Sequence, residues 1–163
     1  MKSETKTTNQ SATGAYTKFF LMLGASFVAM YITMYLNTYA IDHVFFSLTR
    51  FYMTCLGIAA MAVIMWAFMR NMYKDKKKNI AILLGSVLLF ASALSLVRMQ
   101  KPIIGDVLWM KAMIPHHSIA ILTSERADLQ DPEVKQLAKE IIEAQRKEIK
   151  EMKAMIKRLE NEN

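Results

Sequence analysis

Cysteine, glycine and proline are scarce in this chain. Its 163 residues include one cysteine, Cys55, with five glycines and three prolines. A single cysteine excludes an intramolecular disulfide, so cysteine usage gives no indication of the redox compartment. Cys55 itself lies inside an apolar segment, where a small buried residue is the simplest interpretation.

The common signatures of catalysis are absent as well. The sequence contains no glycine-rich phosphate loop, no GxSxG, no CxxC and no HExxH. Nothing in it therefore predicts nucleotide binding, a nucleophile-elbow hydrolase, a dithiol oxidoreductase or a zinc protease. No other pairing of a nucleophile with an acid or base is recognisable. We expect a protein that is not an enzyme.

Positive charge is concentrated in the first two-thirds of the chain. The net charge is +7, with 11 Lys and Arg against 3 Asp and Glu in residues 1–105, but 10 against 11 in residues 106–163. The excess lies at the ends of apolar runs. This placement favours membrane topology over nucleic-acid binding, which would require a basic face on a folded domain.

Three apolar stretches cover residues 16–36, 51–69 and 80–97. Each is close to the roughly 20 residues that a helix needs to cross a bilayer. The second stretch could begin nearer Val44, with Arg50 snorkelling or facing other helices. A cleaved signal peptide is the alternative for the first, but no clear small-x-small cleavage site follows it. We predict a disordered polar tail over residues 1–15 and a three-helix membrane region over 16–100.

The connecting loops predict the orientation in the membrane. Residues 70–78, RNMYKDKKK, hold five basic residues and one acid, whereas the first loop has no Lys or Arg before Arg50. Basic loops remain in the cytoplasm. We therefore expect a multi-pass protein of the cell (inner or plasma) membrane with a cytoplasmic N-terminus. Everything after the third stretch would lie outside the cytoplasm.

Residues 101–163 predict a helical hairpin. Pro102 and Gly105 interrupt the chain, and helical spacing follows over about 106–129 and 132–160. Asp131 and Pro132 are typical of an N-cap and a first helical residue. The fold class is thus all-α, with three transmembrane helices followed by an antiparallel hairpin.

Each predicted hairpin helix carries a stripe with alternating four-three spacing. The stripe of the second helix is Ala138, Ile142, Gln145, Ile149, Met152, Ile156 and Leu159. The stripe of the first is unusually polar for a core: Asp106, Met110, Met113, His117, Ala120, Ser124 and Ala127. Because two helices alone bury little surface, we expect the hairpin to form a homodimer with a second copy, or to pack against the membrane region.

Adjacent histidines stand close to methionines in the first hairpin helix. His116 and His117 follow Met110 and Met113. Imidazole with thioether suits copper, especially Cu(I), while zinc is the alternative metal. The competing interpretation is polar contact along the helix seam. Met152 and Met155 could supply further sulfur or simply pack.

Three further residues, Glu148, Asp106 and His43, are weighed as neighbours of this histidine and methionine cluster. Glu148, beside the second stripe, could orient an imidazole from outside the ligand shell, although a solvated charge is the simpler interpretation. Asp106, the first residue of the first stripe, is another candidate for a position outside the ligand shell. His43, with Asp42 in the first loop, could meet the hairpin histidines, but we expect an ordinary loop residue.

The sequence DVLWMKAMIPHH, followed by DPEVKQLAKEIIEAQRKEIKEM, resembles the domain-of-unknown-function family numbered 305 over the last third of the chain. The family pattern M-I-x-H-H corresponds to Met113, Ile114, His116 and His117. Its Q-x-x-E-I-x-x-M ending corresponds to Gln145, Glu148, Ile149 and Met152. The resemblance implies a ferritin-like four-helix character, of which one hairpin is half, and copper ligation by the histidines and nearby methionines.

The chain departs from the family pattern at one position. Family members usually carry methionine three residues after the alanine that follows the histidines, but here Ala120 is followed by Thr123. Either Met155 replaces this sulfur or the affinity for metal is reduced.

Together these features predict a membrane-anchored, extracytoplasmic copper-binding protein for metal sequestration or handover. Its expected partners are the lipid bilayer, a copper ion and a second copy of the chain. The alternative is a metal-free membrane protein that oligomerises or docks a partner through the hairpin.

Overall fold

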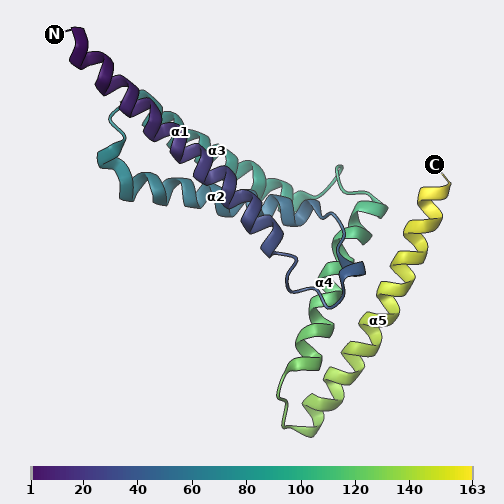
Figure 1. The fold of residues 1–163 in the computed structure, drawn as a ribbon. Coiled ribbons are helices and arrows are strands. Elements are labelled where there is room, and N and C mark those ends of the chain that lie inside the picture. Colours follow the sequence, from purple (N-terminus) through teal and green to yellow (C-terminus); the bar gives the residue numbers. More distant parts are fainter. Residues whose placement is uncertain (1, 163) are drawn as a thin grey trace. The chain divides into compact units, whose positions relative to one another are not determined.

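The computed structural model describes residues 2–162, with side chains from residue 14 onward. Over residues 2–162 the chain forms five α-helices and two short 3-10 helices, with no strand, so the all-helical prediction is confirmed. In chain order these are α1 (Lys2–Thr33), η1 (Ile41–His43), α2 (Leu48–Met69), η2 (Arg70–Met72), α3 (Lys76–Met99), α4 (Asp106–Arg126) and α5 (Pro132–Asn161) (Figure 1).

Three segments are long and apolar enough to cross a membrane. They are Gly14–Thr33, Leu48–Met72 and Lys76–Met99, with mean hydropathies of 1.4, 1.9 and 2.5. Each overlaps one of the predicted stretches, although the ends differ by a few residues.

The N-terminal segment differs from its prediction. Residues 1–15 read as a disordered tail, whereas α1 begins at Lys2 and continues without a break into the apolar segment. Extending an existing helix adds a hydrogen bond for each residue that it orders, while starting one is costly. The apolar segment thus provides a nucleus from which a polar sequence with little periodicity continues as helix.

The chain folds as two compact units. One contains residues 1–31 and 51–99, and the other contains residues 32–50 and 100–163. The sequence had assigned the loop between the first two apolar stretches to the membrane region. Its residues belong instead with the C-terminal helices, because they contact α4 and α5 directly.

In the first unit, aromatic residues of α1 pack against the junction of α2 and α3. Phe19 is fully buried, and its ring meets that of Tyr73 edge-on at 5.4 Å between centroids. The Tyr16 hydroxyl donates to Oδ1 of Asn79 at 2.8 Å. Burial of these rings, together with Ile58 and Ile82, forms the core of this unit.

In the second unit, α4 and α5 lie side by side (Figure 1). The Asp131 carboxylate accepts hydrogen bonds from the backbone N–H groups of Glu133 and Val134, at 2.9 and 3.0 Å, as expected of an N-cap. The predicted stripe of α5 faces α4, and its buried members are Ile149, Met152 and Ile156.

The buried surface of α4 is wider than its predicted stripe. Met110 belongs to both, but Ile114 and Ile121 supply most of the remaining contact with α5. Pro115 and Ser118 are also buried. Asp106 and Ala127, at the two ends of the predicted stripe, are exposed. Consequently α4 is covered on more than one side, which a single four-three stripe does not describe.

Candidate metal centre

Cross-helix ion pairs fix the register between α4 and α5. Lys111, near the start of α4, contacts Glu160 near the end of α5 at 2.5 Å. Glu125, near the end of α4, contacts Arg146, which comes earlier in α5. The helices therefore run antiparallel. Between these two pairs, Nδ1 of His117 lies 2.9 Å from a carboxylate oxygen of Glu148.

His117 is the more enclosed of the adjacent histidines. Its side chain is 17% exposed, and its Nδ1 atom is buried without an aligned hydrogen bond, even though Glu148 is close. Burial lowers the pKa of His117, and the neighbouring His116 acts in the same direction, while the Glu148 carboxylate partly opposes both. The imidazole is therefore neutral at neutral pH, which is the form that binds metals.

His116 faces outward from the same turn. It is exposed, and its ring centroid lies 6.1 Å from that of His117, with the two planes 60° apart. One imidazole is thus enclosed between the helices and the other is accessible to solvent. The pair offers two imidazole groups on one turn of α4.

Thioether sulfurs accompany His117 along the helix pair. Met110 and Met152 are buried in the shared core, only 4% and 5% exposed, and Met113 packs against that core. Met113 precedes His117 by one helical turn, and Met152 follows Glu148 by one turn on the facing helix. The register therefore places Met113, His117, Glu148 and Met152 in adjacent layers.

The remaining sequence candidates lie on the outside. Met155 is 40% exposed, and Asp106 is exposed at the first position of α4. The exposure of Met155 means that it is not part of the α4–α5 core, as Met152 is. Thr123, which stands where the family pattern has methionine, bonds through its hydroxyl to the carbonyl of Ile119 at 2.9 Å. Among the described residues, no three His, Cys, Asp or Glu side chains gather into a group that could hold a metal.

A polar network on another side of α4 was not identified from the sequence. The Ser118 side chain is fully buried, and its Oγ accepts a hydrogen bond from the backbone N–H of Tyr39 at 2.7 Å. The same oxygen lies 2.9 Å from Nδ1 of His43. His43 thus contacts Ser118, the residue after His117, whereas the sequence analysis had considered contact with the histidines themselves.

An ion pair and a hydrogen bond hold the same loop to α5. Lys153 contacts Asp42 at 2.5 Å, and Arg146 donates to the Tyr39 hydroxyl at 3.2 Å while lying over the tyrosine ring. Burial lowers the pKa of His43, and the positive charge of Lys153 lowers it further. The only sequence signal for this network was Asp42 beside His43 in an otherwise apolar loop.

Comparison with known proteins identifies the family. The family described as "Domain of unknown function (DUF305)" matches residues 94–162. An uncharacterized protein, L153, from Acanthamoeba polyphaga mimivirus is 35% identical over 139 residues, which cover 83% of this chain and 89% of the viral protein. The chain belongs to the DUF305 family. This confirms the resemblance found in the histidine and glutamine motifs.

The viral relative extends the similarity beyond the DUF305 match. Because 139 aligned residues cannot fit within residues 94–163, the alignment includes part of the apolar helices. No solved structure matches the chain significantly. DUF305 membership therefore accounts for α4, α5 and their motifs without assigning them a ligand.

Proposed function

We propose that this chain is a membrane-anchored protein that binds copper, as Cu(I), through α4 and α5 outside the cytoplasm. Copper is its cargo, held for sequestration or for handover to another protein. His116 and His117 are the nitrogen ligands, Met110, Met113 and Met152 are the candidate sulfur ligands, and Glu148 orients His117 from outside the ligand shell. Zinc is the alternative metal.

The observation that carries this proposal is the environment of His117. The His117 imidazole is enclosed between α4 and α5, with its side chain 17% exposed. Its neighbour is a carboxylate at 2.9 Å, the partner that metal-binding imidazoles usually have on the nitrogen that does not bind the metal. With Nδ1 directed to Glu148, the other ring nitrogen of His117 is the one that can take copper.

The donor types around His117 favour Cu(I). Imidazole nitrogen and thioether sulfur form a soft set, whereas zinc sites in proteins more often combine histidine with thiolate or carboxylate than with thioether. The thioethers need no deprotonation, and the lowered pKa of His117 favours the neutral ring that binds a metal. Both properties suit a site exposed to the exterior of a cell.

The loop that contacts α4 and α5 supports the proposed topology. Tyr39 and Asp42 lie between the first two apolar segments, yet they bond to Ser118 and Lys153, which follow the third. Groups in direct contact must be on one side of a bilayer. Three crossings would bring these two parts to one side and leave the basic residues 70–78 on the other, which the charge of that loop favours as the cytoplasmic side.

We further propose that two copies associate through α4 and α5 as a ferritin-like four-helix arrangement. Val134 and Leu137, near the start of α5, are 44% and 56% exposed. Apolar side chains at this spacing lie on one helix face and are suited to burial by a second copy.

X-ray absorption spectroscopy of the copper-loaded, full-length protein tests the ligand set. We expect nitrogen and sulfur neighbours around Cu(I), with loss of a nitrogen neighbour in His117→Ala. His43→Ala is the matched control, because it removes the remaining histidine of the same unit and should leave the spectrum unchanged. A copper environment of oxygen and nitrogen alone, or equal effects of both variants, contradicts the proposal.

The second candidate function is a metal-free dimer or docking module, favoured by the exposed Val134 and Leu137. It predicts that chelators do not change the assembly and that His116→Ala/His117→Ala associates normally. Leu137→Asp, at a position that is 56% exposed, would abolish association in this case. Cross-linking of the full-length protein in membranes, with and without chelator, separates the two candidates.

A further inference from the structure

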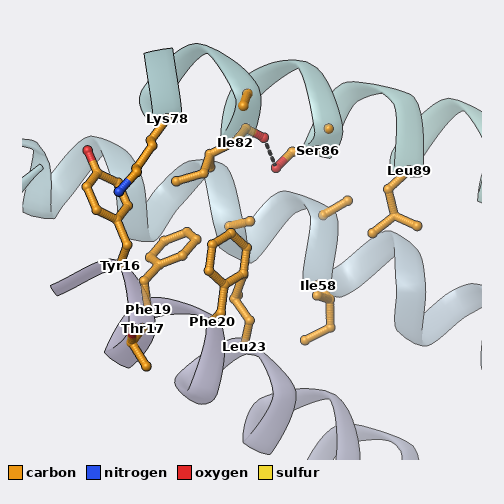
Figure 2. A pocket seen from close by; sticks show the side chains of 14 residues that line it. Tyr16, Thr17, Phe19, Phe20, Leu23, Ile58, Lys78, Ile82, Ser86 and Leu89 are labelled. Atoms are coloured by element: carbon orange, nitrogen blue, oxygen red, sulfur yellow. Dashed lines mark hydrogen bonds between the residues drawn. The ribbon is translucent and has the colours of Figure 1, made fainter. Parts of the chain in front are cut away.

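An apolar groove runs between α1, α2 and α3 in the first unit. It has a volume of about 570 Å³. Its walls include Phe19, Phe20 and Leu23 of α1, Ile58 of α2, and Ile82 and Leu89 of α3 (Figure 2). Phe20 and Leu89 at its rim are 59% and 40% exposed, so the groove is bordered by surface that would face lipid.

One end of the groove is positively charged. Figure 2 shows the Lys78 side chain reaching toward the Tyr16 ring, with its ammonium 5.0 Å from the ring centroid. The Tyr16 ring is itself held in place, because its hydroxyl bonds to Asn79. The amine is therefore positioned at the mouth of an otherwise apolar space.

Asp75, the nearby acid, leaves part of the hydrogen-bonding capacity of the Lys78 amine unused. Oδ1 of Asp75 caps the start of α3 by accepting the backbone N–H groups of Lys77 and Lys78, at 2.9 and 3.2 Å. Its other oxygen is 3.9 Å from the Lys78 amine. An ammonium group has three donors. Residues 70–78 carry five basic side chains and this one acid, so the surroundings favour an anion.

The far wall of the groove is apolar along its length. The one serine that lines it in Figure 2, Ser86, donates to the carbonyl of Ile82 at 2.8 Å and so presents no unsatisfied hydroxyl. On α3 the lining extends from Lys78 to Leu89, which corresponds to about 17 Å at about 1.5 Å per residue. That length is close to half of the roughly 30 Å hydrocarbon core, the depth of one leaflet.

We propose that this groove binds an anionic phospholipid, with one acyl chain along Phe19, Leu23 and Ile82 and the phosphate at Lys78. The lipid belongs to the leaflet on the side of residues 70–78. Its apolar length, its charged end and its position among helices able to span a membrane all match this class of ligand. The site is separate from the copper ligands, so each proposal can fail without the other.

Native mass spectrometry of the full-length protein, titrated with phosphatidylglycerol or phosphatidylcholine, tests the headgroup. We expect phosphatidylglycerol to bind more tightly, and Lys78→Gln to weaken it about fivefold. Lys77→Gln is the matched control, because it removes the same charge from the adjacent residue without lining the groove. Equal binding of the two lipids, or equal effects of the two variants, overturns the proposal.

Filling the groove tests the acyl-chain position. A side chain added at Gly85, which lines the groove, meets no atom within 4 Å of its Cβ, and the same holds at Gly24, which does not line it. Gly85→Leu should therefore displace the bound phosphatidylglycerol, while Gly24→Leu should retain it. Equal retention of phosphatidylglycerol by the two variants overturns the assignment. A dimeric mass that disappears with Gly85→Leu also overturns it, because a second copy of the chain would then occupy the groove. If Gly85→Leu does not fold, the comparison of Lys78→Gln with Lys77→Gln tests whether the groove binds phosphatidylglycerol.

Discussion

Nδ1 of His117 lies 2.9 Å from the Glu148 carboxylate, and the two residues stand on facing helices. This contact links the M-I-x-H-H motif of α4 to the glutamate of the second DUF305 motif on α5. Residues 31 positions apart in the sequence thus meet at one point. The pairing gives the glutamate a specific place beside the proposed copper ligand.

Glu148→Gln should weaken Cu(I) binding by about tenfold or more, because loss of an outer partner commonly costs a metal site that much. The amide still fills the space but no longer supports the basicity of His117. A competition titration with a chromophoric Cu(I) chelator measures the change. Glu151→Gln, at an exposed position that pairs with Lys147, is the matched control. Equal affinities for both variants would remove Glu148 from the site.

Acidification should destabilise the unit formed by residues 32–50 and 100–163. The pKa of His43 is lowered in the folded chain by burial and by Lys153. The unfolded chain therefore binds this proton more readily, so stability rises with pH from the lowered pKa up to the unfolded value of about 6.5. Below that interval the contribution is lost.

Replacing His43 measures this contribution. Hydrogen exchange of the α4 and α5 amides in the full-length protein, at about pH 7.5 and about pH 5.5 with rates corrected for intrinsic pH dependence, gives the stability difference. We expect the difference to shrink in His43→Gln. His117 titrates in the same direction, so some pH dependence should remain. An unchanged pH dependence in His43→Gln would show that His43 does not contribute.

Truncation of the α4–α5 core should loosen both helices together. Ile149 is 3% exposed and packs among Met110, Ile114 and Met152. Ile149→Ala should cost about 2–5 kcal/mol, whereas Ile149→Val should cost about 0.5–1.5 kcal/mol. Hydrogen exchange of the amides in α4 and α5 reports both values. Equal exchange in the two variants would mean that the helices do not depend on this contact.

The sequence predicted α5 better than α4, for a physical reason. The repeat of Ile149, Met152 and Ile156 reflects apolar packing against α4, and the Asp131 cap depends on local backbone alone. Helix α4 also receives the loop at Tyr39 and His43, more than 70 residues away. A periodic stripe records a single buried face, so the burial of Ser118 had no signal in helical spacing.

The candidate site was predicted in part for similar reasons. Adjacency in sequence made His116 and His117 candidates together, and the stripe placed only His117 on the seam, but neither could indicate which group of α5 would meet it. That group is Glu148, which α5 places opposite His117. The sequence placed Met152 on the predicted stripe and offered Met155 only as a possible replacement sulfur; in the structure Met152 belongs to the buried face of α5 and Met155 is 40% exposed.

Cysteine labelling tests the orientation of the chain. Cys55 is buried and can be replaced by serine to give a background without reactive thiols. In that background, Asn161→Cys should react with a membrane-impermeant maleimide in intact cells, since we place α5 outside the cytoplasm. Lys76→Cys should react only after permeabilisation. The reverse pattern would place α5 in the cytoplasm and contradict the proposed topology.

Cu(I) affinity of the full-length protein, compared with His116→Ala/His117→Ala under reducing conditions, tests the central proposal most directly. Competition against a chromophoric chelator gives the affinity and the number of ions bound. We predict that the wild-type chain binds Cu(I) and that the double variant loses this binding, while His43→Ala retains it. Equal affinity and stoichiometry in the wild-type chain and the double variant would contradict the copper site.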